Sequence, residues 1–179
     1  QLLNDIRHAD EGRIACQVPT ATATPPPTPV PDSSSVRGVL TYQSRTNQSG
    51  IRVELYTTTG QFLSETATAS DGSFSFSTVP AGDYMAQATA GGHLALQHPA
   101  IVTNDGLGFD IGSHVLKAGD TDGNQSIDLA DAVFIGGNFN VPAPPAPNTA
   151  DLNADGFIDI RDLVLVGGNF GLTGPIVER

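Results

Sequence analysis

The sequence predicts a multidomain β + α chain, in which a small antiparallel β-sandwich is followed by a two-helix module with a duplicated acidic loop. Three observations predict this fold class. Residues 36–116 contain short stretches of alternating apolar and polar residues, an acidic twelve-residue pattern occurs at 120–131 and again at 151–162, and both copies run on into Gly-Gly-Asn-Phe. The chain has 179 residues, which is enough for one or two small domains.

The N-terminal stretch is expected to lie outside these modules. Residues 20–31 contain only Thr, Ala, Pro and Val, a composition that favours extended polyproline II and cannot bury a core. We therefore assign 20–35 to a Pro/Thr-rich linker, of the kind that joins modules in secreted bacterial proteins, and 1–19 to the remnant of an upstream region. Cys16 is the only cysteine, so no internal disulfide can form.

Short strands separated by turns are expected between residues 36 and 116. The strand patterns fall at 36–40, 51–55, 62–68, 74–76 and 84–90. Turn-forming residues separate them at 57–60, 70–72 and 79–82. Several short strands at this spacing favour an antiparallel sandwich.

The acidic pattern has the spacing of a twelve-residue calcium loop, with oxygen-bearing side chains at positions 1, 3, 5, 9 and 12. In the first copy the candidate ligands are Asp120, Asp122, Asn124, the Ser126 carbonyl, Asp128 and Asp131. In the second copy they are Asp151, Asn153, Asp155, the Phe157 carbonyl, Asp159 and Asp162. The alternative is an acidic surface loop without a metal. Two copies in register, identical at nine of 20 aligned positions, favour two bound Ca²⁺ ions.

The two loops differ at position 6, where the chain needs a positive φ that glycine adopts most easily. The second loop has Gly156, whereas the first has Gln125, which should cost roughly 1 kcal/mol of strain. We therefore expect the first loop to bind calcium more weakly. Ile127 and Ile158 occupy position 8, where the apolar sides of two such loops can meet.

Helices are expected directly after each loop, at 129–138 and 160–169. No helix is expected directly before either loop. The pattern at 114–119 is typical of a strand and a turn, and 141–147 is rich in proline. The glycine pairs at 136–137 and 167–168 cost about 1 kcal/mol per residue inside a helix. They either serve close packing of the two helices, end the helices, or leave a flat face for a partner.

A duplicated loop-then-helix pattern with Asp at position 12 resembles a dockerin module of type I, here over residues 117–175. The resemblance implies a calcium-folded module that docks secreted proteins onto cohesin domains, mostly in bacterial polysaccharide-degrading systems. It places partner-binding residues at loop positions 10 and 11, which are Leu129, Ala130, Ile160 and Arg161 in this sequence. The Ser-Thr-like pair frequent at these positions in type I dockerins is absent, and so is the basic pair further along the helix.

The preceding segment, residues 36–116, is similar to the carboxypeptidase regulatory-like, prealbumin-like family of β-sandwiches. The residues that carry this resemblance are Asp71-Gly72, Phe74 and Phe76, and the turn at 79–82. Such domains are spacers and binding supports, so no peptidase activity is implied. Because only a few residues separate 116 from the first acidic loop, we expect the two modules to form one rigid unit.

The net charge and the absence of certain motifs disfavour several classes of function for this sequence. A net charge of −11 with eight basic residues disfavours nucleic-acid binding, and no run of 18 apolar residues indicates a membrane helix. No nucleophile elbow, phosphate loop or zinc signature points to an enzyme or to a small-molecule substrate.

We therefore expect a non-catalytic, calcium-binding attachment module, extracellular or at the bacterial cell surface, that docks a larger secreted protein to a cohesin-type partner. One alternative is a calcium-stabilised C-terminal cap that packs on the sandwich without a separate partner. Another is the tail of a glycoside hydrolase whose catalytic domain lies outside this sequence.

Overall fold

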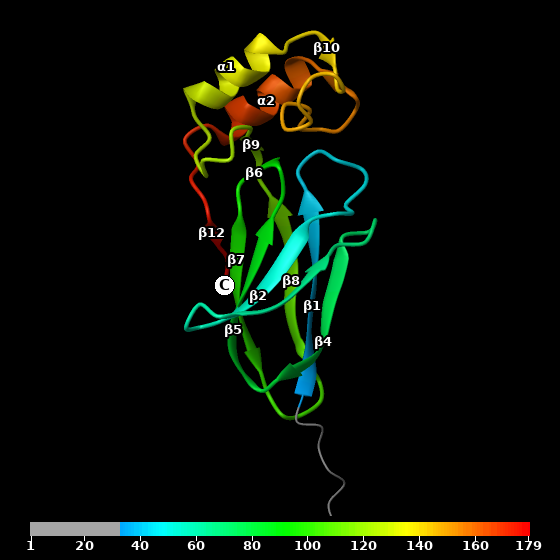
Figure 1. Cartoon of the computed structure of the whole chain (residues 1–179), viewed down its shortest axis with the longest axis vertical. Helices are drawn as coiled ribbons and strands as arrows, with labels where there is room; N and C mark the ends of the chain where they lie inside the picture. The colour runs from blue at the N-terminus through cyan, green and yellow to red at the C-terminus, as the bar shows by residue number, and fades with distance from the viewer. Residues whose placement is uncertain (1–32) are drawn as a thin grey trace, which may run out of the picture.

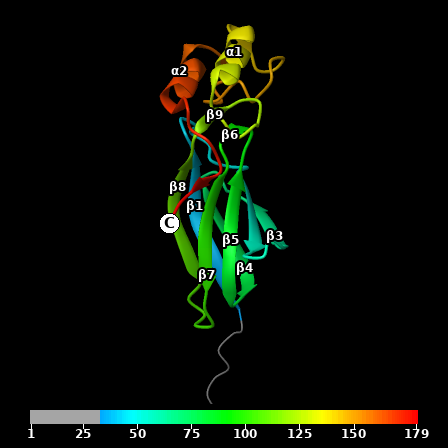
Figure 2. The ribbon, with the colours of Figure 1, turned by 90° about the vertical axis from the view of Figure 1, so that its left-hand side faces the viewer.

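The computed structural model describes residues 33–179. The expected upstream remnant, most of the expected linker and Cys16 therefore lie outside the described residues. Two bodies follow one another along the long axis: strands form the larger one, and two short helices lie at one end of it (Figure 1). The N-terminal strand enters at the opposite end, and the C-terminal residues return from the helices to the side of the strands (Figures 1 and 2).

The larger body is a sandwich of two sheets. The first has the order β4-β1-β8, formed by β1 (Ser33–Tyr42), β4 (Ser73–Pro80) and β8 (Phe109–Leu116). The second has the order β12-β7-β5-β2-β3, formed by β2 (Arg52–Thr57), β3 (Phe62–Ala67), β5 (Gly82–Thr89), β7 (Leu96–Val102) and β12 (Ile176–Val177). The pairs β1–β8 and β12–β7 are parallel and the other pairs are antiparallel.

Two pairs of short strands lie at the junction and within the helical end. β6 (Gly92–His93) pairs with β9 (Ala118–Asp120), and β10 (Val141–Pro142) pairs with β11 (Phe157–Ile158). The helices are α1 (Leu129–Gly137) and α2 (Ile160–Asn169). Each helix starts at position 10 of its acidic loop, and within residues 33–179 no helix lies directly before either loop, as the sequence predicts.

Each body has its own hydrophobic core. Side chains from both sheets, such as Leu40 and Leu55, are fully buried between them. The alternating burial along β4 and β5 explains why period-two patterns predicted these strands. A second cluster lies under the helices and includes Ile127, Ile158 and Val166.

The expected β-sandwich followed by a two-helix module is confirmed, and three details differ from the expectation. The sandwich is mixed and not purely antiparallel, because β1 runs parallel to β8 and β12 runs parallel to β7. The predicted turn at 79–82 is shorter, because β4 continues through Pro80 and β5 begins at Gly82. The chain after α2 does not end with the helical module, because β12 pairs with β7 of the sandwich. Neither helix in the described part of the chain is long and apolar enough to cross a membrane.

His93, in β6, should make the fold sensitive to acid. Its ring is buried, and desolvation lowers its pKa from 6.5 to about 4. Between these pH values His93 is protonated in the unfolded chain but neutral in the folded chain. Stability from this group is complete above about pH 6.5 and is lost as the pH falls toward 4. We expect the free energy of unfolding at fixed calcium to drop by about 1 kcal/mol between pH 7.5 and 5.5, as measured by denaturant titration.

The variant His93→Gln isolates this contribution, because it removes the titrating group and leaves every other one in place. Its pH dependence should be shallower than that of the wild type by the same amount. Equal slopes for the two proteins would show that His93 does not govern acid sensitivity.

Candidate functional site

The carboxylate at position 12 of the first loop faces inward and holds the loop together. Asp131 is fully buried. Its Oδ1 accepts hydrogen bonds from the Thr121 amide at 2.7 Å and hydroxyl at 2.9 Å, and its Oδ2 accepts one from the Asp128 amide at 2.9 Å. The Asp128 side chain in turn accepts from the Asp131 amide, which completes a capping box at the start of α1, and it also accepts from the Ala130 amide at 2.7 Å. One side chain thus connects both ends of the loop to the helix.

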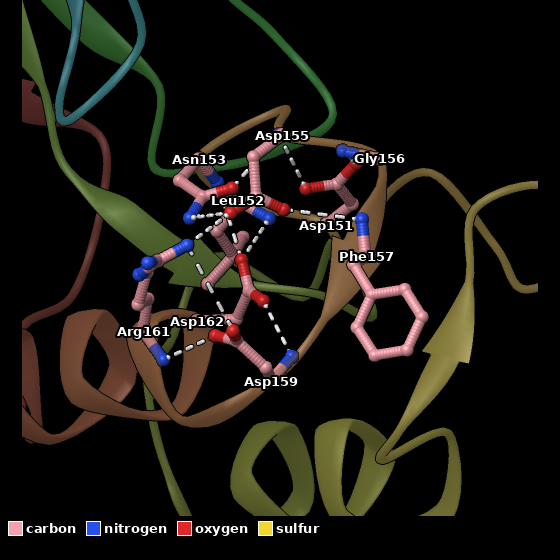
Figure 3. Close-up of polar contacts among 9 residues, drawn as sticks. All are labelled: Asp151, Leu152, Asn153, Asp155, Gly156, Phe157, Asp159, Arg161 and Asp162. Atoms are coloured by element: carbon pink, nitrogen blue, oxygen red, sulfur yellow. Dashed lines mark hydrogen bonds and ion pairs between the residues drawn. The ribbon is translucent and has the colours of Figure 1, made fainter.

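The second loop repeats this arrangement (Figure 3). Asp162 is fully buried, and its Oδ1 accepts from the Leu152 and Asn153 amides at 2.8 and 3.2 Å. Its Oδ2 accepts from the Asp159 amide at 3.0 Å, and Asp159 caps α2. Neither position-12 carboxylate points into solvent, so both are oriented toward their loops.

Three carboxylates converge in the first loop. Oxygens of Asp120, Asp122 and Asp131 lie within 4.8 Å of one another. Asp120 is almost completely buried, and its Oδ1 has no hydrogen-bond partner. The pKa of Asp120 is raised, mainly by burial and also by the nearby charges of Asp131 and Asp122, against a hydrogen bond from the Gln125 amide that lowers it. A buried oxygen without a partner is costly, and a hard cation is the partner that this set of oxygens fits.

The second loop carries the same number of carboxylates, but positions 3 and 5 are exchanged: Asn153 and Asp155 stand where the first loop has Asp122 and Asn124. Within residues 33–179 only the first loop forms a group of three close acidic side chains. Burial raises the pKa of Asp151, against hydrogen bonds from the Gly156 and Asp155 amides. For Asp155, burial acts to raise the pKa, but hydrogen bonds from Asn153 and Arg161 outweigh it and the pKa is lowered.

In both loops, other predicted ligand side chains accept hydrogen bonds from the backbone amide two residues further along the chain, and so form tight turns. In the first loop the Asn124 side chain accepts from the Ser126 amide at 2.7 Å. In the second loop Asn153 accepts from the Asp155 amide at 2.9 Å, and Asp155 accepts from the Phe157 amide at 3.1 Å. These turns bring the side chains at positions 3 and 5 to one side of the loop. The two loops therefore offer oxygen-rich sites suited to Ca²⁺.

The backbone shows left-handed residues in both loops, and the expected weaker binding of the first loop stays a prediction. Gln125 has the predicted positive φ of 64°, but position 4 is left-handed as well. There the first loop has Gly123 at φ 77° and the second has Ala154 at φ 56°, while Gly156 has φ 89°. Each loop thus combines one glycine with one strained residue, so strain alone does not make the first loop weaker.

The loops are paired across the repeat. The Gly171 amide donates to the Ile127 carbonyl at 2.8 Å, and the Asn140 amide donates to the Ile158 carbonyl at 2.8 Å. These two bonds are 31 residues apart at both ends, like the repeat itself. The backbone at position 8 of each loop therefore bonds to the segment that follows the other loop's helix, while Ile127 and Ile158 share one hydrophobic cluster.

The residues predicted to bind a partner all lie exposed at the helix starts. Leu129 and Ile160 are 67% and 58% exposed, and Ala130 and Arg161 are also exposed. One turn later, Val133 and Val164 are 64% and 63% exposed. We call Leu129, Val133, Ile160 and Val164 the apolar helix face. The valines were missed from the sequence, although their place four residues after Leu129 and Ile160 indicates the same helix side.

The glycine pairs do not serve helix packing. A side chain at any of the glycines at 136–137 and 167–168 would meet nothing within 4 Å. The first pair ends α1, whereas α2 continues through the second pair to Asn169. The expectation that the helices pack closely at these glycines is therefore wrong, and the pairs leave bare backbone on the surface instead.

Comparison with known families identifies both modules. Residues 35–112 match the carboxypeptidase regulatory-like domain, and residues 118–170 match the dockerin type I domain. The chain carries a carboxypeptidase regulatory-like domain followed by a type I dockerin domain. A comparison with curated protein sequences gave no match.

Solved structures share the arrangement of the two domains. Two crystal structures of type II cohesin–X-dockerin complexes from Acetivibrio cellulolyticus, an N-terminal and a C-terminal interface mutant, contain similar chains with TM-scores of 0.64 and 0.62. In both cases 22% of residues are identical, and the similarity covers 78% of this chain and 97% of the other. At this identity the likeness shows a common fold that includes both the sandwich and the dockerin domain.

The dockerin domain is attached to the sandwich by polar contacts that sequence analysis did not find. Arg45, in the β1–β2 connection, donates to the Leu152 carbonyl of the second loop at 2.8 Å, and its guanidinium lies 4.5 Å from the centre of the Tyr42 ring. At the end of α2, Asn169 donates to Gln43, the residue after β1, at 2.6 Å, and to the Ala118 carbonyl within its own domain at 2.7 Å. The bonds of Arg45 to Leu152 and of Asn169 to Gln43 cross between the two domains, and they support the expectation of one rigid unit.

The left-handed Ala154 offers a test of the loop geometry of the dockerin domain. Ala154→Gly should stabilise the calcium-saturated protein by about 1 kcal/mol, because glycine adopts this φ without strain. The matched control is Ala130→Gly on the exposed start of α1, where glycine should destabilise by about 1 kcal/mol. Denaturant titrations of both variants should shift in opposite directions, and a destabilising Ala154→Gly would contradict the observed backbone.

Proposed function

We propose that this chain is a calcium-dependent, non-catalytic attachment module, outside the cell or on its surface, that docks a larger protein onto a cohesin-type partner. The observation that carries the proposal is the pair of buried carboxylates, Asp131 and Asp162, each of which faces its loop and supports a helix whose first turn is apolar and exposed. Ion binding and partner binding thus depend on the same loop–helix unit.

The ion-binding half of the proposal follows from electrostatics. Eight of the 19 acidic residues lie in the two loops, and clustered carboxylates repel one another unless a cation neutralises them. Two Ca²⁺ ions would neutralise half of that charge. The ligands that we propose are those predicted from the sequence, six in each loop. Calcium would supply the positive charge that lets Asp120, Asp122 and Asp131 stay together.

The docking half follows from the surface of the helices. The apolar helix face is exposed, whereas the side chains of both hydrophobic cores are buried. Exposed apolar patches mark interaction sites. The bare backbone at the glycine pairs beside it admits close approach. The matched family and the cohesin complexes named for the similar structures indicate a cohesin-type partner. Because no Ser-Thr-like pair is present at positions 10 and 11, the partner's complementary surface should be largely apolar.

The structural cap is the second candidate. The return of β12 to β7, the bond from Arg45 to Leu152 and the bond from Asn169 to Gln43 favour a dockerin domain that stiffens the end of the sandwich. A cap of this kind needs no separate partner. Binding to cohesins distinguishes the two candidates, because only the attachment module presents its helix face to another protein.

Calcium dependence can be measured directly. Isothermal titration should give two ions per chain, and Asp131→Asn and Asp162→Asn should each lose one, because each removes the buried carboxylate of one loop. A chelator should abolish the helical signal in circular dichroism while the strand signal remains. Full helicity at high chelator concentration would refute calcium-driven folding.

Partner binding requires the apolar helix face. In a panel of cohesins, Val133→Asp combined with Val164→Asp should reduce affinity at least about tenfold, because it places charges in the centre of the contact. The matched control is Leu107→Asp, because Leu107 is 74% exposed in a sandwich loop and lies outside the dockerin domain. Wild-type affinity in the double variant, or no binding of the wild type to any cohesin, would favour the structural cap.

A further inference from the structure

Gln125 is placed where it joins the first calcium loop to the sandwich. Its backbone amide and its side-chain Nε2 both donate to Oδ2 of Asp120 at 3.1 Å. Its Oε1 accepts from the Ala95 amide, just before β7, at 2.9 Å. Its own carbonyl accepts from the Gly174 amide at 2.8 Å. One residue therefore contacts a predicted calcium ligand, the sandwich and the C-terminal segment.

The contacts with Asp120 leave one oxygen for the ion. Because Gln125 engages Oδ2 twice, the carboxylate is held in one orientation, and Oδ1 is the buried oxygen without a partner. Gln125 therefore orients the ligand without occupying the oxygen that would bind the ion.

The C-terminal segment continues from Gln125 to the sheet edge. After Gly174, the Ile176 amide donates to the Ala95 carbonyl at 2.8 Å, and the Glu178 amide donates to the Gln97 carbonyl at 2.9 Å. Ala95 thus bonds to Gln125 through its amide and to β12 through its carbonyl. A side chain at Gly174 would meet Oε1 of Gln125 at 2.5 Å, so the segment packs tightly over this amide (β12 is labelled in Figure 1).

The second loop has no equivalent of this side chain. Gly156 holds Asp151 through its backbone amide alone, at 2.9 Å. The contact of this loop with the sandwich comes from the other side, where Arg45 donates to a backbone carbonyl. Gln125 adopts φ 64° at a position where glycine would be free of strain. Its side-chain hydrogen bonds offset that cost, which explains a non-glycine residue at position 6.

We propose that Gln125 is a positioning residue that couples calcium binding in the first loop to the attachment of β12 and the dockerin domain on the sandwich. The inference rests on the proposed function, since it assumes that the loop binds calcium. An ion on Asp120 fixes the loop, and the fixed loop keeps Gln125 in place for Ala95 and Gly174. By linkage, attachment of the C-terminal segment strengthens calcium binding in the same loop.

The decisive variant is Gln125→Gly, because two explanations predict opposite results. If position 6 mattered only for backbone strain, glycine would tighten calcium binding. If Gln125 couples the site to the sandwich, glycine should weaken the first loop by about fivefold and leave the second unchanged. A calcium-buffered titration of the full chain followed by nuclear magnetic resonance resolves the loops, with the Gly123 amide reporting on the first and the Gly156 amide on the second.

Hydrogen exchange on the same samples reports on the attachment. At saturating calcium the Ile176 and Glu178 amides should exchange roughly tenfold faster in Gln125→Gly than in the wild type. Ala154→Gly is the matched control, because it relieves strain in the second loop without removing a contact to the sandwich. It should not weaken either loop, and it should leave the exchange of Ile176 and Glu178 unchanged.

Gly174→Ala tests the same coupling with Gln125 intact, because the added methyl group displaces the Gln125 amide. It should weaken the first loop like Gln125→Gly, and the two changes together should add little. Unchanged or tighter first-loop binding in Gln125→Gly, or unchanged exchange at Ile176 and Glu178, overturns the coupling alone. A wild type in which neither glycine amide responds to millimolar calcium overturns the proposed function as well.

Discussion

The buried carboxylate at position 12 is the feature on which each half of the dockerin domain depends. Asp131 and Asp162 accept backbone hydrogen bonds from the start of their loop and from the residue that caps the following helix. Closing the loop and starting the helix are therefore one event. A buried carboxylate needs compensation for its lost hydration, and these amides supply part of it. In the first loop, oxygens of Asp120, Asp122 and Asp131 lie within 4.8 Å of one another, and a cation would balance their charge.

Duplication turns this unit into a domain. Neither repeat can form its strand-like pairing alone, because Ile127 bonds to residues after α2 and Ile158 bonds to a residue after α1. The same exchange buries both isoleucines in one cluster. Each loop thus depends on the segment that follows the opposite helix, so the two repeats should order together rather than in sequence. The symmetry also places the two halves of the apolar helix face on equivalent first turns.

Much of this arrangement could be predicted from the sequence because it is encoded locally. The carboxylate spacing indicated the ligands, the loop-then-helix repeat indicated where the helices start, and alternation indicated the strands. Strain at Gln125 was predicted correctly, but Ala154 was overlooked, since the sequence gives no sign that position 4 is left-handed when alanine occupies it. Contacts such as those of Arg45 and Asn169 could not be predicted, because they depend on how two modules meet rather than on any periodic pattern.

The junction shows why the modules cannot be separated at the point where the sequence patterns change. Leu94 directly follows β6, and Ala118 is the first residue of β9. Both are fully buried in the cluster beneath the helices and not in the sandwich core. Ile176, beyond the residues that match the dockerin family, packs against the same cluster. Burying a leucine side chain contributes about 2 kcal/mol, which is a substantial part of the stability of so small a core. The sandwich is therefore more than a spacer: it supplies one wall of the dockerin core, and it receives the end of the chain in return.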